Sequence, residues 1–472
     1  MARSPQDRLH LGAIVTAGPG TGAFGAWRYP SSEQFRFLDA EYYQQIARTL
    51  ERGKFDLIFF ADKLAVPGRF PKSVEENLRN GSWGSAHPEP LVLLASIAAA
   101  TERIGLASTI STSYGAPFHV ARSVATLDHI SKGRAAWNVV TSTEDSEAQN
   151  FGLDKQRERG SRYDIADEFL RVVFGLWDTW EDGAVVMDRE AGVVIDPSKV
   201  HPLNHDGKHF RVRGPLNLPR PPQGYPVLAQ AGSSDRGRDF AARWSELIFT
   251  PQPVLSAARA FYEDIKARAA NQGRNPNEIK VLPGAFIVVG ESEGIAREKD
   301  EVLRSFVDLA AARVGLSSML EMDLSQVPPG TSASELLASR SVEGMQGHVD
   351  ALAQIAKAEN LTIDQLGARF SHSLTFARFA GSPVQVADQL EHWFRSGACD
   401  GFIIRPSYLP GSMEEFVRLV VPELQRRGLF RKEYEGTTLR QHLGLARPPH
   451  GSWRKRFAQT SRSPETEAAA AP

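Results

Sequence analysis

The sequence is poor in cysteine, in net charge and in long apolar runs. Only one of its 472 residues, Cys399, is cysteine, so no disulfide can form within the chain, which is typical of proteins in a reducing cytosol. The 55 basic and 56 acidic residues nearly cancel, which argues against nucleic acid or a membrane surface as a partner. No stretch approaches about 18 uninterrupted apolar residues, and the charged N-terminus is unlike a signal peptide. We therefore expect a cytoplasmic protein.

Short motifs of several common enzyme classes are also missing. The one match to GxGxxG, GTGAFG at 20–25, does not open a helical segment, and no GxxxxGK[ST] occurs, which argues against dinucleotide and P-loop sites. The sequence lacks the HExxH of zinc enzymes, and we do not predict a Ser–His–Asp hydrolase. His201, His205 and His209 recur every four residues, but they lie in a stretch rich in Gly and Pro, where that spacing does not align the rings. We predict no metal site.

What the sequence does contain is an alternation of short apolar runs with segments of helical periodicity. The run FDLIFFA is nearly all apolar, as a parallel strand buried on both faces would be. Residues 40–52 and 163–180 carry apolar side chains at helical spacing. Repeated strand–helix units predict a parallel sheet, and eight of them favour a closed (β/α)8 TIM barrel over an open sheet. The eight strand candidates are residues 9–16, 55–61, 104–110, 134–140, 226–230, 246–250, 279–289 and 400–404.

We expect a single barrel domain over residues 1–445, with two insertions. Residues 183–222 are rich in Pro, Gly and His and predict a β-excursion, whereas residues 295–371 are mostly helical in pattern. Residues 446–472 differ in composition from the rest and are expected to form a flexible C-terminal tail.

Small or polar side chains follow the strand candidates. Asp62, Thr109 and Asn138 lie at the ends of the second, third and fourth strands, and Ser233 and Ser234 follow the fifth. In parallel barrels the functional groups lie at the carboxyl ends of the strands, so these side chains would share one rim. The segment GSSDRG also opens a helix, whose N-terminal amides suit a single phosphate group. An ordinary serine N-cap is the alternative.

Other candidates lie in a basic cluster, among the aromatic residues and among the histidines. Arg159 and Tyr163 precede the long helical segment together with Arg157 and Arg162, and such groups bind phosphate when they are not simply solvated. Candidates for an apolar pocket wall are Phe24, Trp27, Phe249 and Trp137, although we favour packing in the core for Trp137. No residue stands out as a general base; His87 and His119 are the candidates for proton transfer.

Long stretches of the chain resemble one protein family. These stretches are GAWRYP (25–30), YYQQIARTLERGKFDLIFFAD (42–62), HVARSVATLDHISKGRAAWNVVTS (119–142), NFG (150–152), RYDIADEFL (162–170), VRGPLNLPRPPQGYPVLAQAGSS (212–234) and DGFIIRPSYLPGS (400–412). They are similar to the nitrilotriacetate, pristinamycin and dibenzothiophene-sulfone monooxygenase group of bacterial-luciferase-like flavoproteins, and most of all to the last. The resemblance extends to about residue 445.

The resemblance implies a (β/α)8 barrel that binds FMN as FMNH2, supplied by a separate NAD(P)H-dependent flavin reductase. It implies insertion of one oxygen atom of O2 into a small-molecule substrate through a flavin C4a-(hydro)peroxide, by a homodimer or homotetramer. The implied flavin contacts are Asp62, Thr109 and Asn138 at the ring, and Arg159, Tyr163, Ser233 and Ser234 at the phosphate. At Arg159 the family often has His.

Two departures from the family leave the substrate open. Phe24 stands where the sulfone-oxygenating relatives have His, and residues 315–327 also differ. We expect an apolar or aromatic xenobiotic, for example an organosulfur, organohalogen or heteroaromatic compound. One alternative is a polycarboxylate, for which the cations would be Arg28, Lys63, Arg69 and Arg405. Others are an F420-dependent oxidoreductase of the same superfamily and a non-catalytic flavin-binding barrel.

Overall fold

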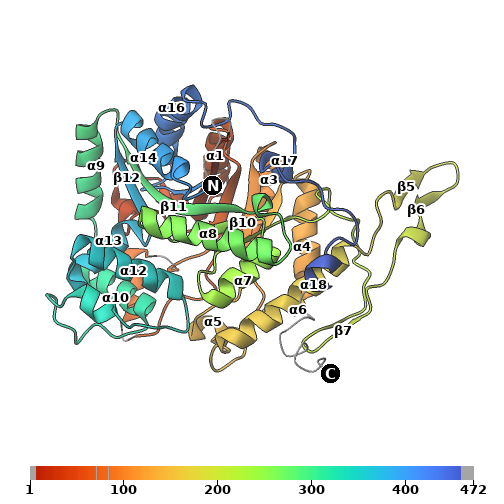
Figure 1. Ribbon diagram of the computed structural model, residues 1–472, viewed down its shortest axis with the longest axis horizontal. Coiled ribbons are helices and arrows are strands. Elements are labelled where there is room, and N and C mark those ends of the chain that lie inside the picture. The colour runs from red at the N-terminus through yellow and green to blue at the C-terminus, as the bar shows by residue number, and fades with distance from the viewer. Residues whose placement is uncertain (1–6, 71, 83, 459–472) are drawn as a thin grey trace, which may run out of the picture.

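A computed structural model describes residues 7–70, 72–82 and 84–458. Eight parallel strands close into a barrel, and helices surround it (Figure 1). The predicted (β/α)8 barrel is confirmed, and each predicted strand occurs. These strands are β1 (His10–Thr16), β2 (Leu57–Ala61), β3 (Gly105–Ser111), β4 (Ala135–Val140), β9 (Val227–Gln230), β10 (Leu247–Thr250), β11 (Lys280–Val289) and β13 (Gly401–Arg405).

The ring closes where β11 pairs with β10 on one side and with β13 on the other, while β13 also pairs with β1. A further strand, β12 (Ala377–Gly381), pairs in parallel with the C-terminal half of β11. The β12 strand was not predicted, because its five residues ARFAG include only one large apolar side chain.

The alternation of side chains along each strand separates two apolar layers. Phe60, Leu106 and Ile404 pack outward beneath the helices, whereas Phe59 and Ile403 fill the barrel interior. The surrounding helices are α1 (Ala40–Arg52), α3 (Pro90–Ala100), α4 (Pro117–Ile130), α6 (Arg159–Trp177), α7 (Asp235–Trp244), α8 (Leu255–Asn271), α14 (Pro383–Arg395) and α16 (Val421–Arg426). None of the helices in the described ranges is both long and apolar enough to span a membrane.

The α1 helix illustrates why these segments fold as they do. Its first turn is capped by Asp39, whose side chain accepts a hydrogen bond from the backbone N–H of Glu41 at 2.9 Å. Tyr43, Ile46 and Leu50, spaced three and four residues apart, are buried against the barrel.

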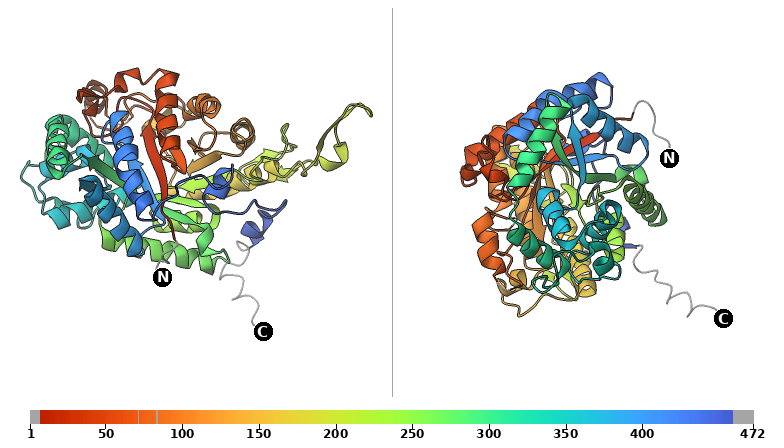
Figure 2. Two further views of the ribbon diagram at one scale, coloured as in Figure 1. Left: turned by 90° about the horizontal axis from the view of Figure 1, so that it is seen from above. Right: turned by 90° about the vertical axis from the view of Figure 1, so that its left-hand side faces the viewer.

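Two additions extend the barrel in opposite directions. One contains the β5 (Val185–Asp188) and β6 (Val193–Ile195) hairpin, which projects far from the body, and the small β7 (His205–Asp206) and β8 (Arg211–Val212) pair (Figures 1 and 2). The other is helical and has an apolar core of its own. Its helices are α9 (Glu293–Ser305), α10 (Leu309–Leu320), α11 (Ala333–Leu337), α12 (Gln346–Glu359) and α13 (Ile363–Ser373).

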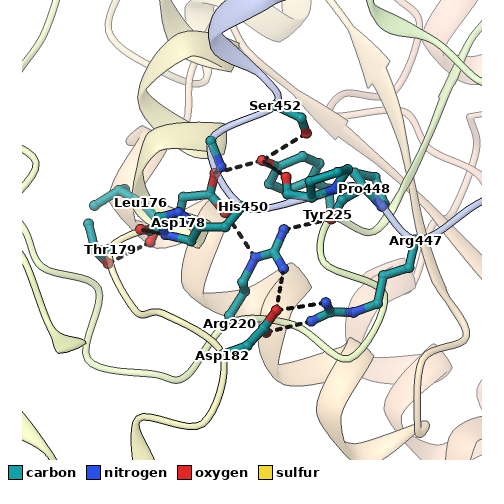
Figure 3. Close-up of polar contacts among 12 residues, drawn as sticks. Leu176, Asp178, Thr179, Asp182, Arg220, Tyr225, Arg447, Pro448, His450 and Ser452 are labelled. Atoms are coloured by element: carbon teal, nitrogen blue, oxygen red, sulfur yellow. Dashed lines mark hydrogen bonds and ion pairs between the residues drawn. The ribbon is translucent and has the colours of Figure 1, made fainter.

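The described part of the C-terminal segment is tied to the barrel by a buried network (Figure 3). The Arg220 side chain donates to the Asp178 carboxylate at 2.9 Å and to the carbonyl of Pro448 at 2.9 Å. Asp178 also accepts from the hydroxyl of Tyr225 and the backbone N–H of Gly451, each at 2.6 Å. The expected flexible tail falls partly outside the described residues, from 459 onward.

Candidate functional site

A cavity of about 250 Å³ lies at the carboxyl ends of the barrel strands, and the helical addition forms part of its wall. Most of the residues predicted from the sequence line it. They are Asp62, Thr109, Asn138, Arg159, Tyr163, Ser233 and Ser234 of the predicted flavin site, and Phe249 of the predicted pocket.

One end of the cavity is built to hold an anion. Ser234 caps α7, with its Oγ accepting from the N–H of Gly237 at 3.2 Å, and the N-terminus of this helix carries a partial positive charge. Arg159 and Arg162, in the first turn of α6, form no ion pair within the described ranges and bond instead to backbone carbonyls. Burial raises the pKa of the Tyr163 phenol, so it stays a neutral donor.

The approach to this end is narrow. A Cβ atom added to Gly232 would lie 2.8 Å from the Tyr163 hydroxyl and 2.3 Å from Nε2 of Gln230. A glycine at this position therefore leaves room for a ligand to approach the backbone.

A second group of polar side chains lies deeper in the barrel, at the ends of β3 and β4. The Asn138 amide donates to Thr109 Oγ1 at 3.0 Å, and Thr109 donates to the carbonyl of Phe60 at 2.8 Å. Asn138 Oδ1 and Gln230 Oε1 are buried and accept no hydrogen bond from the described residues. Buried polar atoms are rarely left without partners, so these two atoms mark where a ligand with donor groups would bind.

The Asp62 carboxyl lies in a poorly solvated, negatively charged corner. Burial raises its pKa to about 6, and the nearby Glu89 and Glu147 carboxylates add to the rise. The backbone N–H of Lys63 donates to Asp62 at 2.8 Å, while the Lys63 ammonium pairs with Glu144.

His87 lies beside this corner, with its Nδ1 3.8 Å from Asp62 Oδ1, although it does not line the cavity. Burial lowers the pKa of His87 to about 4, and neither ring nitrogen has a hydrogen-bond partner among the described residues. The ring is therefore neutral near pH 7. His119 lies elsewhere, on the exposed side of α4.

The structure does not bring the other aromatic candidates to the cavity. Phe24 lies behind its wall, packed edge-on against Phe370 at 6.1 Å, because its loop docks on the helical addition. Trp27 lies at the surface, 43% exposed, where its ring donates to the carbonyl of Asn80 at 3.1 Å. Trp137 packs outward against Phe169 of α6, as favoured from the sequence.

Several wall residues were not identified from the sequence. The helical addition supplies Met319, Gly344–His348, Phe370 and Leu374. His348 is half-buried, and its Nδ1 lies 2.7 Å from Thr375 Oγ1. Their positions have no signal at the strand ends, because these residues come from a segment between strands.

This donor set fits FMN. The anion end offers serine hydroxyls, a helix N-terminus, a phenol and two arginines without carboxylate partners, which suits one phosphate group. The unpartnered acceptors Asn138 Oδ1 and Gln230 Oε1 suit a flat ring that carries N–H groups.

Comparisons with known proteins agree with this fold. Residues 21–400 match the family model described as luciferase-like monooxygenase. The chain is 45% identical over 444 residues to dibenzothiophene-sulfone monooxygenase from Rhodococcus erythropolis (strain XP), covering 94% of this chain and 98% of that one. It is 48% identical over 431 residues to nitrilotriacetate monooxygenase component A from Aminobacter aminovorans, covering 90% and 94%.

A solved structure is similar over nearly the whole fold. It is that of a riboflavin lyase with modified FMN and the substrate riboflavin, which is 30% identical, with a TM-score of 0.85 and coverage of 95% of this chain and 99% of that one. The chain is therefore an enzyme of the luciferase-like monooxygenase family.

Proposed function

We propose that the protein is the oxygenase component of a two-component system, binding FMNH2 and inserting one oxygen atom of O2 into a small organic molecule. The observation that carries this proposal is the anion end of the cavity, where the N-terminus of α7 faces Tyr163, Arg159 and Arg162. FMN bears a single phosphate, which is what this end of the cavity can hold.

In this proposal the protein binds the flavin, orients its ring and excludes water from the site. Ser233 and Ser234 hold the phosphate with Tyr163, while Asp62, Thr109 and Asn138 contact the ring. Phe59 and Phe249, whose rings lie 5.8 Å apart, form an apolar wall that keeps water from the reacting atoms. Reduced FMN would supply the two electrons needed to place one oxygen atom of O2 in the substrate and release the other as water.

Two partners belong to this proposal. A separate NAD(P)H-dependent flavin reductase would deliver FMNH2. The similar nitrilotriacetate monooxygenase is named component A, which supports a system of more than one component here. The second partner is another copy of the chain, as homodimer or homotetramer. The projecting β5–β6 hairpin supports self-association, because its valines are exposed.

The reaction is tested by coupling the protein to a generic flavin reductase with FMN, NADH and ¹⁸O2. We expect one ¹⁸O atom in an organic product, identified by mass spectrometry from a panel of organosulfur, organohalogen, heteroaromatic and carboxylate compounds. Omitting the protein is the control. If the panel gives only uncoupled hydrogen peroxide while reduced F420 binds and FMNH2 does not, the proposal is wrong.

The flavin site is tested separately by anaerobic titration with FMNH2. Asp62→Ala removes a proposed ring contact, so we expect at least a fivefold loss of affinity with the fold retained. Asp188→Ala, on the exposed β5–β6 hairpin, is the matched control. Equal affinities of the two variants would remove Asp62 from the site.

A further inference from the structure

The interior of the barrel contains one arginine in an unusual position, Arg405 at the end of β13. Along this strand Phe402 and Ile404 point outward to the helices, and Ile403 points into the barrel. The same alternation turns Arg405 inward, where it lines the cavity and is only 2% exposed.

The Arg405 guanidinium has no acidic partner in the described part of the chain. Its only hydrogen bond there runs from Nη2 to the carbonyl of Gly22, at 2.6 Å, and its Nε is buried without an acceptor. The guanidinium carbon also lies 5.8 Å from the centre of the Phe376 ring. Burying a cation without an anion is costly, so such an arrangement is expected where a ligand completes the pair.

The other cations considered for a polycarboxylate are already engaged or lie elsewhere. Lys63 pairs with Glu144, and Arg69 pairs with Glu321 at 3.0 Å. Arg28 is exposed and lies over the Phe306 ring, outside the cavity. Of the four, only Arg405 both lines the cavity and lacks a carboxylate partner.

Arg405 is also far from the anion end around the ring of strands. The order of strands around the barrel is β13, β1, β2, β3, β4, β9, β10, β11, so β13 stands opposite β4. The phosphate donors follow β4 and β9, on α6 and the N-terminus of α7. The cavity therefore has two positive ends, and a phosphate held at one leaves the other free.

We infer that Arg405 binds the carboxylate of a substrate that carries a single negative charge and an apolar body. This inference rests on the proposed function and narrows its substrate class. The apolar body would lie against Phe59, Phe249 and Phe376, whose rings contact one another in series at 5.8 Å and 5.5 Å. One free guanidinium matches one carboxylate through paired N–H donors, whereas a tricarboxylate would leave two charges uncompensated.

The test measures binding, so that it does not depend on turnover. Benzoate, phenylacetate and 3-phenylpropanoate are titrated calorimetrically into FMN-saturated protein, each beside its uncharged amide. We expect at least one acid to bind about tenfold more tightly than its amide. Nitrilotriacetate, with three carboxylates, should bind more weakly than that acid. If no acid binds better than its amide, the inference is overturned without any variant.

Variants then assign the preference to Arg405. We expect Arg405→Met to abolish the preference for acid over amide, and Arg405→Lys, which keeps the charge but not the fork of donors, to retain part of it. The matched control is Arg28→Met, which should leave the preference intact. If Arg405→Met unfolds the protein, Arg405→Lys is the deciding variant. Full retention of the preference for acid over amide by Arg405→Lys would overturn the role of the guanidinium fork.

Two further results would overturn the inference and are separable from a failure of the proposed function. A loss of FMN affinity in Arg405→Met, with unchanged relative binding of acid and amide, would make Arg405 a flavin contact. A preference for the acid that survives Arg405→Met would place the carboxylate elsewhere. The proposed function itself fails only by its own test, when the reductase-coupled assay gives no oxygenated product and reduced F420 binds in place of FMNH2, whatever the acid and amide titrations show.

Discussion

At the scale of single residues, the raised pKa of Asp62 makes a prediction about stability and pH. The carboxyl titrates near 3.8 in the unfolded chain and at about 6 in the folded protein, so folding disfavours its charged form. The cost is fully present above pH 6 and is relieved as the pH falls from 6 towards 3.8. Asp62→Asn removes the charge and keeps the acceptor for the N–H of Lys63. We expect it to raise the free energy of unfolding by about 1–3 kcal/mol at pH 8.

The measurement is urea unfolding of both proteins at pH 8 and at pH 5. The stabilisation should shrink at the lower pH, because there the wild-type carboxyl is largely protonated. A stabilisation of equal size at both pH values would show that the Asp62 charge is not its source.

Gly232 gives a second prediction at this scale. Gly232→Ala places a Cβ atom against Gln230 and Tyr163, where the phosphate would bind, so we expect FMNH2 affinity to fall at least tenfold. Gly160→Ala is the control, since a Cβ there meets nothing within 4 Å outside its own helix backbone. Anaerobic titration of both variants makes the comparison. Equal affinities would place the phosphate away from Gly232.

The site residues that could be predicted are those whose positions are set by the local sequence pattern. Period-two alternation and the end of an apolar run suffice to place Asp62, Thr109 and Asn138 at the rim, because strand geometry alone sets their direction. Phe24 and Trp27 lie in the connection between β1 and α1, whose path depends on docking against residues far along the chain. Their positions therefore follow from tertiary packing and have no local sequence signal.

At the scale of elements, the barrel strands follow from local sequence pattern, whereas the additions depend on tertiary packing. Eight strands were predictable because each is a distinct apolar run between helical segments. The wall formed by Gly344–His348 was not, since these residues reach the cavity only after α10–α13 have formed their own core. The strand β12 (ARFAG) was missed because its composition is not that of a buried strand; it is a strand because it pairs with the neighbouring β11.

At this scale we predict that the C-terminal segment after residue 445 stabilises the fold. Ending the chain at Leu445 would remove Gly451, which donates to buried Asp178, and Arg456, which donates to buried Glu246 at 2.8 Å. Removing a partner from a buried charge is costly. We therefore expect a loss of about 3 kcal/mol in the free energy of unfolding, measured by urea denaturation. A chain ending at residue 458 keeps both contacts and is the control; equal stability of the two truncations would contradict the anchoring role.

At the scale of the whole molecule, the projecting β5–β6 hairpin is the feature that a single copy leaves unexplained. Its residues include Val185, Val186 and Val194, which are 43%, 44% and 58% exposed. A two-stranded hairpin with both faces in water is marginally stable, so these apolar side chains need a covering surface. With a net charge near zero, copies of this chain do not repel one another strongly, which favours a second copy as that surface.

Val186→Asp tests this role of the hairpin. A carboxylate at the centre of a buried apolar contact would have to be desolvated, so we expect the variant to dissociate to smaller species than the wild type at micromolar concentration. Val384→Asp is the matched control, because Val384 is 51% exposed in the first turn of α14, where an acidic residue is favourable. Sedimentation velocity measures the masses. If Val186→Asp and the wild type sediment alike while both retain FMNH2 binding, association uses another surface, and the hairpin has to be explained by a partner such as the reductase.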